Sequence, residues 1–321
     1  MPNRAAEGPV VSVVIPARDA AGTLGRTLAA LEAQDLEAPF ETVVVDNGSV
    51  DDTASIVERS PLPTRLIRLE RGGGPGEARN AGARAARAAA IAFTDADCFP
   101  TPAWLREGLA ALTQAELVQG RVEPEPGAAL AAFDHTVWVT RPSPLYETAN
   151  LLIRRPLFER LGGFVDWQAI DSGRPFGEDV WLGWRARREG ARIGFAERAL
   201  VHHAVVHRTP AAYLADQARL RWFPPLVARI PELRREFLRA GLFLTSRSAR
   251  FDLALAGAAA AVATRRCLPV LACAPYLAEL GARAVPHGRR APLIGAVELA
   301  ADALGFAALL AGSARSRTPV L

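Results

Sequence analysis

Two separate pairs of acidic residues in this sequence have a spacing that suits metal binding or proton transfer. Asp95 and Asp97 lie at positions i and i+2, directly after the apolar run that ends at Thr94. At a strand end such carboxylates can turn onto one ion, and their hard oxygens suit Mg²⁺ or Mn²⁺. Acids are also common in solvated turns. The prediction of a metal site therefore depends on the position of the two acids directly after a buried strand.

Glu178 and Asp179 form the second pair, at the start of a helix predicted over Gly177–Glu189. The helix dipole favours ionised carboxylates at this end, and Trp181 and Trp184 offer apolar cover. A partly desolvated carboxylate is what a general base needs in order to deprotonate a hydroxyl group. Taken alone, the pair fits an ordinary acidic helix N-terminus better.

Two further segments have the composition of a nucleotide site. Asp46 follows an apolar run, where an acid can accept hydrogen bonds from a base or ribose, although Asp46 and Ser49 also suit a tight turn with a helix cap. Glycines at 72–74 and 76 precede a helix predicted over Glu77–Ala90 that carries Arg79. Such a loop lets backbone approach a phosphate. The loop lacks the GxGxxG spacing of glycines that is typical of a site for a nicotinamide dinucleotide.

Three of the five histidines, His202, His203 and His207, fall within six residues. No cysteine or acid beside them completes a tetrahedral zinc set. One of them, His203 or alternatively His202, is a candidate to join the ion at Asp95 and Asp97. An edge-strand histidine with a satisfied hydrogen bond explains the residue equally well.

Strand and helix alternate over the residues that must position these groups. Apolar runs predict strands over Val10–Ile15, Thr42–Val45, Arg65–Leu69 and Ile91–Thr94, with helices over 23–31, from 51, and over 77–90. This alternation indicates βαβ units and a mostly parallel sheet. Ligands of such sheets lie at the carboxyl ends of the strands, where the polar and glycine residues of this sequence gather.

Beyond Asp97 the alternation loosens. The pattern predicts helices over 104–112 and 209–222 and strands over 117–122, 148–153, 192–195 and 199–203. From Pro224 onward the sequence predicts only helices, over 226–244, 251–262 and 293–310. We therefore expect an α/β domain over 1–223 and a helical region over 224–321.

Composition excludes several classes of chemistry. The 321 residues are 50% apolar and 22% charged, enough for a sizeable core, and all 38 basic residues are arginine. Without lysine there is no Schiff-base chemistry and no P-loop.

Three cysteines without CxxC spacing argue against a disulfide framework or structural zinc, which favours a reducing, cytoplasmic location. The first residues contain no apolar core of a signal peptide.

The charge of the chain is uneven. Residues 241–321 contain nine arginines and four acids, whereas the whole chain carries +4. A basic, apolar tail suits an anionic membrane surface better than nucleic acid. Its apolar runs are interrupted by Arg265 and Arg266 and by Glu298 and Asp302, so neither reaches the length of a spanning helix. A packed helical subdomain and helices lying on a membrane both remain open.

Taken together, these segments resemble the family-2 glycosyltransferases. The matching strings, in order over about residues 10–210, are VSVVIPARDAAGTL, VVVDNGSVDDT, GPGEARNAGARAA, IAFTDADC, ANLLIRR, LGGF, FGEDVWLGWRARREG and ALVHH. The resemblance implies the GT-A fold, Rossmann-like with a mixed sheet flanked by helices, here with a C-terminal helical extension.

The resemblance also implies an activity and a set of roles. A sugar would pass from a UDP- or GDP-sugar to an acceptor hydroxyl with inversion, the acceptor being a glycan, a lipid-linked molecule or a small molecule. Asp179 would be the base, with Glu178 beside it. The residues that would bind the donor nucleotide are Pro16, Ala17, Arg18, Asp46, Arg79 and Asp95. Those that would contact the donor sugar or the acceptor are Asn150 and Trp181. The ligands of Mn²⁺ or Mg²⁺ would be Asp95, Asp97 and His203.

One departure from the family pattern bears on processivity. Processive synthases of this family carry QxxRW, whereas residues 217–222 read QARLRW, one residue longer. We therefore expect single additions to the acceptor. Two other activities stay open: a sugar-nucleotidyltransferase, which usually has a GxGTRxxP loop and a lysine that this chain lacks, and a non-catalytic scaffold that binds nucleotide sugars.

Overall fold

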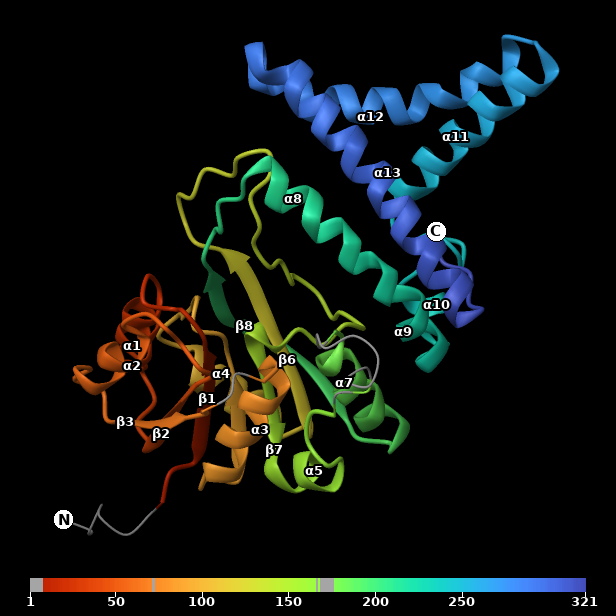
Figure 1. The fold of residues 1–321 in the computed structure, drawn as a ribbon. Coiled ribbons are helices and arrows are strands. Elements are labelled where there is room, and N and C mark those ends of the chain that lie inside the picture. The colour runs from red at the N-terminus through yellow and green to blue at the C-terminus, as the bar shows by residue number, and fades with distance from the viewer. Residues whose placement is uncertain (1–7, 71–72, 166, 168–175) are drawn as a thin grey trace. The chain divides into compact units, whose positions relative to one another are not determined.

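The computed structural model describes residues 8–70, 73–165, 167 and 176–321. The chain divides into two compact units: Met1–Ala129 with Thr136–Val206, and Leu130–His135 with His207–Leu321. We call them the sheet unit and the helical unit (Figure 1). The boundary predicted from the sequence, at 223/224, falls inside the helical unit.

The sheet unit is built on eight strands in the order β3-β2-β1-β4-β7-β6-β8-β5. The strands are β1 (Val11–Ala17), β2 (Phe40–Asp46), β3 (Thr64–Arg68), β4 (Ala90–Phe93), β5 (Cys98–Pro100), β6 (Leu117–Pro124), β7 (Leu151–Arg154) and β8 (Ile193–His203). The first four pair in parallel and β6 pairs in parallel with β8, while β7 and β5 run antiparallel to their neighbours. The predicted mixed sheet with parallel βαβ units is confirmed.

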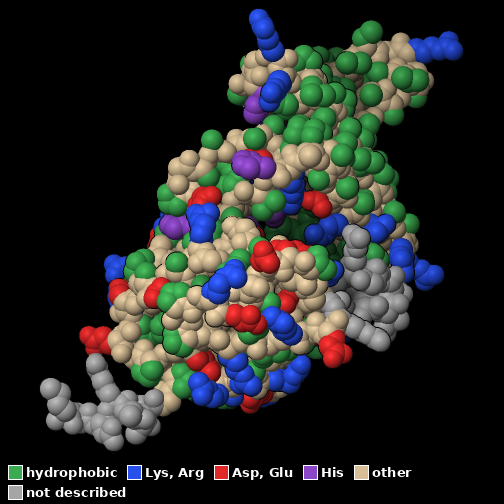
Figure 2. All heavy atoms as spheres, turned by 60° about the vertical axis from the view of Figure 1, so that its left-hand side comes forward, with side chains coloured by type: hydrophobic (Ala, Val, Ile, Leu, Met, Phe, Trp, Pro, Cys, Tyr) green, Lys and Arg blue, Asp and Glu red, His purple; other side chains and the backbone are tan. Residues whose placement is uncertain are grey.

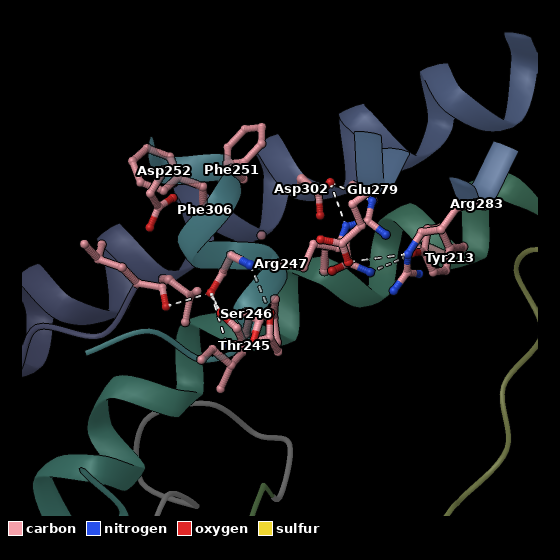
Figure 3. A pocket seen from close by; sticks show the side chains of 18 residues that line it. Tyr213, Thr245, Ser246, Arg247, Phe251, Asp252, Glu279, Arg283, Asp302 and Phe306 are labelled. Atoms are coloured by element: carbon pink, nitrogen blue, oxygen red, sulfur yellow. Dashed lines mark hydrogen bonds and ion pairs between the residues drawn. The ribbon is translucent and has the colours of Figure 1, made fainter. Parts of the chain in front are cut away.

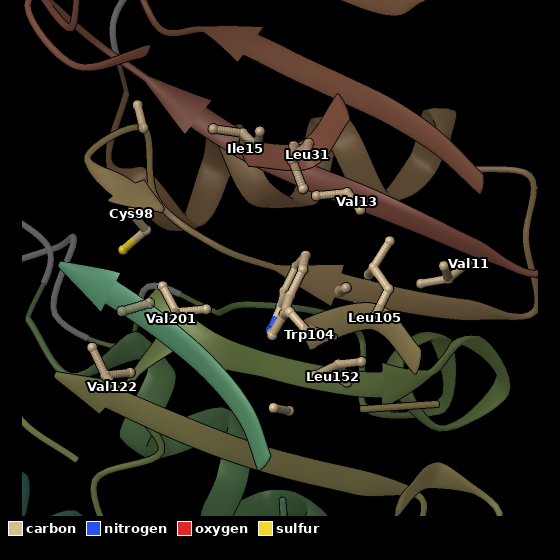
Figure 4. Packing of buried hydrophobic residues seen from close by; sticks show 14 of the residues in the cluster. Val11, Val13, Ile15, Leu31, Cys98, Trp104, Leu105, Val122, Leu152 and Val201 are labelled. Atoms are coloured by element: carbon tan, nitrogen blue, oxygen red, sulfur yellow. The ribbon is translucent and has the colours of Figure 1, made fainter. Parts of the chain in front are cut away.

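Helices cover both faces of this sheet. They are α1 (Leu24–Glu32), α2 (Thr53–Glu58), α3 (Pro75–Ala85), α4 (Trp104–Leu112), η1 (Thr148–Asn150), α5 (Arg155–Arg160) and α7 (Glu178–Arg188). On one face, Val11, Val13 and Ile15 of β1 pack with residues of α1 and α4, including Leu31 and Trp104 (Figure 4). On the other face, a Cβ on Gly82 of α3 would lie 2.4 Å from Val14 Cγ1. The glycine thus permits a close helix–strand approach.

The boundaries differ from the sequence prediction in specific places. Helix α3 ends at Ala85 because Ala86 is extended, and Ala90 belongs to β4. The two strands predicted over 192–203 are one strand, β8, whose pairing with β6 shifts register between Gly120 and Arg121. Strand β5 and helix α5 were not predicted, since three and six residues are too few to establish a periodic pattern.

The helical unit contains α8 (Pro210–Gln217), η2 (Ala218–Trp222), α9 (Phe223–Arg229), α10 (Leu233–Glu236), α11 (Ser246–Thr264), η3 (Leu268–Cys273), α12 (Ala274–Ala284), η4 (Val285–Arg290) and α13 (Ala291–Ser316). The helix predicted over 226–244 is wrong as a single element. It is broken after Arg229 because Pro231 follows, and residues 239 and 243 form an isolated bridge. Helix α12 was not predicted.

A buried ion network ties α11 to α13 inside this unit. Arg247 Nη2 lies 2.6 Å from Asp302 Oδ2, and Arg247 Nη1 lies 2.5 Å from Glu298 Oε2. The Tyr276 hydroxyl donates to the same Asp302 oxygen at 2.7 Å. Arg247 and Asp302 border a cavity of about 480 Å³ that the helical unit lines (Figure 3). Arg283 Nη1 of α12 lies 3.9 Å from Glu298 Oε2, so two arginines face the two acids of α13.

The length and composition of one helical segment correct the expectation that the tail contains no helix apolar enough to span a membrane. Within the described residues, the continuous helical segment Leu268–Ser316 meets that requirement by length and composition, with a mean hydropathy of 1.9 in its most apolar window. Gly288 interrupts it with non-helical backbone angles, so the long straight helix is α13.

Candidate active site

One buried arginine joins the two acidic motifs of the sequence. Arg79, on α3, is 5% exposed, and its Nη2 donates to Asp95 Oδ1 at 2.7 Å. Its Nη1 lies 3.5 Å from Glu178 Oε1 at the start of α7. Burial opposes the charged form, but the pKa of Arg79 is raised overall, because Asp95 and Glu178 stabilise the cation. The end of β4 and the start of α7 therefore converge on one guanidinium.

Glycine at position 76 makes this convergence sterically possible. A Cβ there would lie 3.2 Å from both Glu178 Cγ and Phe164 Cβ. The Phe164 backbone is in turn held by Asn80, whose amide donates to the carbonyl at 2.7 Å and accepts from the N–H at 2.8 Å. The start of α3 thus packs closely against the residues that precede and open α7.

Asp179 has the electrostatic character of a general base. Burial, and then the charge of Glu178, raise the pKa of the Asp179 carboxyl to about 8, against a smaller opposite effect of Arg79. Its Oδ1 accepts a hydrogen bond from the Val180 N–H at 2.8 Å. A carboxyl group with this pKa can take up and release a proton near neutral pH.

The candidate metal site lies beside Asp95 and centres on Asp97 and His203. Asp97 Oδ2 is 3.7 Å from His203 Nε2, and a ligand atom of Cys98 completes a group within 4.8 Å. His203 Nδ1 is 2.7 Å from the Ala204 carbonyl, which accepts a hydrogen bond only from a protonated Nδ1. In the neutral ring the lone pair of Nε2 then faces a carboxylate. Two acceptors in this arrangement require a proton or a cation between them.

The donor set of this group is a carboxylate, an imidazole and a thiol. Burial, and then the charges of Asp95 and Asp97, raise the pKa of the Cys98 thiol well above its usual value. The carboxylate and the imidazole are ligand types that can hold a divalent cation. Asp95, the other predicted ligand, is engaged by Arg79 in this conformation.

The other two histidines lie apart from this group. His202 precedes His203 on the same strand, so its side chain points to the opposite face of the sheet. His207 belongs to the helical unit, where its Nδ1 is 2.9 Å from Asp134 Oδ2. The geometry therefore favours His203 of the two alternatives.

The predicted nucleotide residues gather at the ends of β1 and β2. Ala17 pairs in register with Asp46, and Pro16 precedes it on the same strand, while Arg18 lies just beyond, with its side chain 59% exposed. Asp46 Oδ1 accepts from the Ser49 N–H at 2.9 Å, which is the turn that the sequence suggested.

Asn47 connects this edge to the glycine-rich loop. Its amide donates to the Gly73 carbonyl at 2.8 Å and accepts from the Gly73 N–H at 3.0 Å. Gly72, the first glycine of the predicted loop, lies outside the described residues. The reciprocal pair of bonds fixes the backbone that leads into α3 and Arg79.

Asn150 and Trp181, the residues predicted to meet sugar or acceptor, are both buried. Asn150 has no exposed surface: its Oδ1 accepts from Trp104 Nε1, and its amide nitrogen donates to the carbonyls of Arg121 and Ala199. These bonds use both hydrogens of the amide. Asn150 thus braces the sheet in this conformation, and its contact with a sugar stays a prediction. Trp181 is 9% exposed.

Two residues of interest were not identified from the sequence. Glu147 accepts from Gln119 Nε2 at 2.7 Å and from Ser143 Oγ at 3.1 Å, and its charge contributes to the raised pKa of Asp179. Trp138 is 61% exposed, two residues from Thr136, whose hydroxyl lies 3.5 Å from His203 Nδ1. Neither residue lies in a periodic segment, so no sequence pattern distinguished them from ordinary loop residues.

Comparison with known proteins gives one consistent result. Residues 12–164 match the model of Glycosyl transferase family 2. Glycosyltransferase AglE of Haloferax volcanii is 30% identical over 209 residues, which cover 61% of this chain and 67% of that protein. The succinoglycan biosynthesis protein ExoO of Rhizobium meliloti is 34% identical over 192 residues. That match covers 54% of each chain, so it spans about half the length of ExoO.

Solved structures agree on the fold. A mannosyltransferase of Pyrobaculum calidifontis, solved with GDP-Man and Mn²⁺, aligns with a TM-score of 0.63 at 23% identity, covering 94% of this chain and 88% of that chain. Residues 1–349 of S. aureus TarS, solved with UDP-GlcNAc, align with a TM-score of 0.50 at 19% identity, covering 96% and 92%. The α/β fold with a C-terminal helical extension, implied by the sequence resemblance, is confirmed.

Proposed function

This chain belongs to glycosyl transferase family 2, and we propose from that premise that it is an inverting, metal-dependent enzyme that adds single sugars to an acceptor hydroxyl. The observation that carries the proposal is the buried Arg79, which brings Asp95 within 2.7 Å on one side and Glu178 within 3.5 Å on the other. The candidate base, Asp179, follows Glu178 directly. Asp95, which lies near the candidate metal ligands, and Glu178, which is next to the candidate base, thus belong to one cluster.

Asp179 is the group that we assign to proton transfer. Its pKa of about 8 makes it a stronger base than an ordinary aspartate, once it is deprotonated. It would accept the proton of the acceptor hydroxyl as the oxygen attacks the anomeric carbon. Attack opposite to the leaving group inverts the configuration, and no covalent intermediate is needed.

Asp97 and His203 are the residues that would hold the cation, with Asp95 able to join when it exchanges its contact with Arg79. A Mn²⁺ or Mg²⁺ ion bound there supplies Lewis-acid neutralisation of the leaving nucleotide diphosphate. His203 Nδ1 lies 2.7 Å from the Ala204 carbonyl, and a hydrogen bond to that oxygen would leave Nε2 as the coordinating atom. Arg79 adds a positive charge next to Asp95.

The donor is a nucleotide-diphosphate sugar, with Pro16, Ala17, Arg18 and Asp46 contacting its nucleotide. The structural neighbours contain GDP-Man and UDP-GlcNAc, and both uridine and guanosine stay candidate bases for this chain. For the sugar and the acceptor, the exposed Trp138 offers an aromatic face that a sugar ring could contact, whereas Trp181 and Asn150 are buried.

The acceptor class and the cellular location complete the proposal. We assign a glycan, lipid-linked or small-molecule acceptor in cell-envelope or glycan synthesis, because ExoO is named for succinoglycan biosynthesis. The three cysteines are free, which fits reaction in the cytoplasm.

The test is turnover by the purified chain across a panel of UDP- and GDP-sugars, with Mn²⁺, Mg²⁺ or EDTA. We expect release of the nucleotide diphosphate with one donor, loss of that release in EDTA, an inverted product by NMR and a single added sugar by mass spectrometry. A scaffold would bind a nucleotide sugar without turnover. A nucleotidyltransferase would release pyrophosphate from a nucleoside triphosphate and a sugar phosphate. Either result would replace the proposal.

A further inference from the structure

One edge of the helical unit exposes apolar side chains that nothing in the described structure covers. We call residues 262–293 the α12 edge, because α12 joins its two turns, one between α11 and η3 and the other at η4 (Figure 1). The exposed large apolar residues of this edge, each between 50% and 80% exposed, are Val262, Leu268, Val270, Leu271, Leu277, Val285 and Leu293. Figure 2 likewise shows hydrophobic side chains over much of the helical unit's visible face.

Arginines lie at both ends of this edge. Arg265 and Arg266 are exposed at the end of α11, and Arg289 and Arg290 are exposed directly before α13. None of these four has an ion pair within the described part of the chain. The single acid of the segment is Glu279, and it is paired with Arg250 and Arg283. The exposed charge of the edge is therefore positive.

Helix α13 is unsuited to leave this unit and span a bilayer by itself. A Cβ on its Gly312 would lie 2.2 Å from the Arg221 carbonyl oxygen, so the helix packs directly on η2. Its two acids are bound by Arg247 of α11, and separation would leave three charges unpaired. The packing therefore favours a surface that rests on a membrane over a helix that crosses it.

Exposed leucines and valines between two pairs of arginines have the chemistry of an interfacial membrane-binding surface. The apolar side chains can enter the boundary of headgroups and acyl chains, and the guanidinium groups can contact lipid phosphates. We propose that the α12 edge docks this protein on the surface of an anionic phospholipid membrane without crossing it. The inference does not rest on the proposed sugar transfer.

Flotation of the full-length chain with vesicles tests the proposal. We expect the protein to float with phosphatidylcholine vesicles that contain a quarter phosphatidylglycerol, and to remain behind with pure phosphatidylcholine. Each double variant R265Q/R266Q and R289Q/R290Q should lower partitioning by roughly 30-fold, since each arginine contributes about fivefold near an anionic surface. The variant L268S/L271S should lower it by at least as much, because both side chains are meant to enter the lipid.

Matched control variants lie in the sheet unit. R59Q/R84Q removes two exposed arginines there, and V50S removes a valine that is 94% exposed. Both should float like the parent chain. Circular dichroism of every variant excludes unfolding as the cause of a change.

The exposed Cys267 gives a second, local measurement. A polarity-sensitive dye attached there, in a C273A background, should shift to shorter wavelength with anionic vesicles. The same dye on V50C, in a C267S/C273A background, should not shift.

Three outcomes would overturn the proposal. Equal flotation with neutral and anionic vesicles, unaffected by the arginine variants, would remove the electrostatic docking. Protein that resists extraction by alkaline carbonate would instead span the membrane. A concentration-dependent dimer that L268S/L271S abolishes, without vesicle binding, would identify a second copy as the partner. Turnover measured in parallel with a water-soluble acceptor keeps failure of docking distinct from failure of the proposed activity.

Discussion

In each unit of this protein an arginine with little solvent exposure lies between two acids, and the two arrangements have different roles. In the helical unit, Arg247 binds Glu298 and Asp302, which lie four residues apart on α13, and Tyr276 adds a hydrogen bond to Asp302. In the sheet unit, Arg79 binds Asp95 and Glu178, which come from two distant segments.

The two networks differ in the acids that lie beside each arginine. Arg283 of α12 lies 3.9 Å from Glu298 and supplies a second cation next to the acids that Arg247 binds, so this network holds α11, α12 and α13 together. Beside Arg79, by contrast, the Asp179 carboxyl has its pKa raised to about 8. A network that closes on itself stabilises the fold, whereas one that leaves a reactive acid next to a buried cation provides a site for chemistry.

The sharpest test of this contrast replaces one buried acid in each unit. Asp179→Asn should lower turnover by about 10²- to 10⁴-fold, because the base is lost, while donor binding persists. Asp252 is the matched control: it is a partly buried acid of the helical unit, and burial raises its pKa to about 6. Asp252→Asn should leave turnover unchanged. Initial rates and calorimetric donor titration measure both, and equal loss in the two variants would abolish the distinction.

Removal of either arginine should cost stability, but only one should affect the reaction. Arg79→Gln and Arg247→Gln each remove the cation between two carboxylates, and each should lower the free energy of unfolding by about 3–5 kcal/mol. Urea unfolding measures this. Arg106→Gln, which breaks a solvent-exposed pair with Asp35, should cost less than about 1 kcal/mol. Turnover per folded molecule should fall for Arg79→Gln alone. A similar fall for Arg247→Gln would contradict the assignment.

Asn150 lies in the sheet unit, but its hydrogen bonds give it a structural role like that of Arg247 in the helical unit. Asn150→Ala leaves the Trp104 N–H and two backbone carbonyls without their partner, so it should lower stability by about 1–3 kcal/mol. The KM values for donor and acceptor should change less than about twofold. A tenfold rise in KM at unchanged stability would instead support the sugar contact that the family resemblance implies.

The pH dependence should separate activity from stability. Because Asp179 acts as a base with a pKa of about 8, kcat/KM should rise about tenfold per pH unit below 8 and then level off. Its pKa is higher in the folded than in the unfolded chain, so its contribution to stability is full below about pH 4 and is lost as the pH rises through 8. Asp179→Asn should flatten this part of the stability profile. A flat rate profile between pH 6 and 8 would exclude Asp179 as the base.

Much of the sheet unit was accessible from the sequence because its signals are local. Continuous apolar runs identify β1, β2 and β4, and polar residues after each strand indicate the ligand-binding edge before any family is considered. Short elements such as β5 are supported by pairing with β8 and have too few residues for a pattern. The helix predicted over 226–244 failed because the periodicity of its apolar residues outweighed Pro231 in the prediction.

Sequence patterns were enough to establish the alternation of strands and helices, the basic and apolar character of the tail, and the position at element ends of Asp46, Asp95, Asp97 and Asp179. The fold was needed to show that Arg79 joins Asp95 to Glu178, that Asn150 makes all its hydrogen bonds inside the core, and that Glu298 and Asp302 pair with Arg247. The physical reason is that periodicity and end signals act over a few residues. Burial, pKa and ion pairing depend on neighbours that the fold brings from distant parts of the chain.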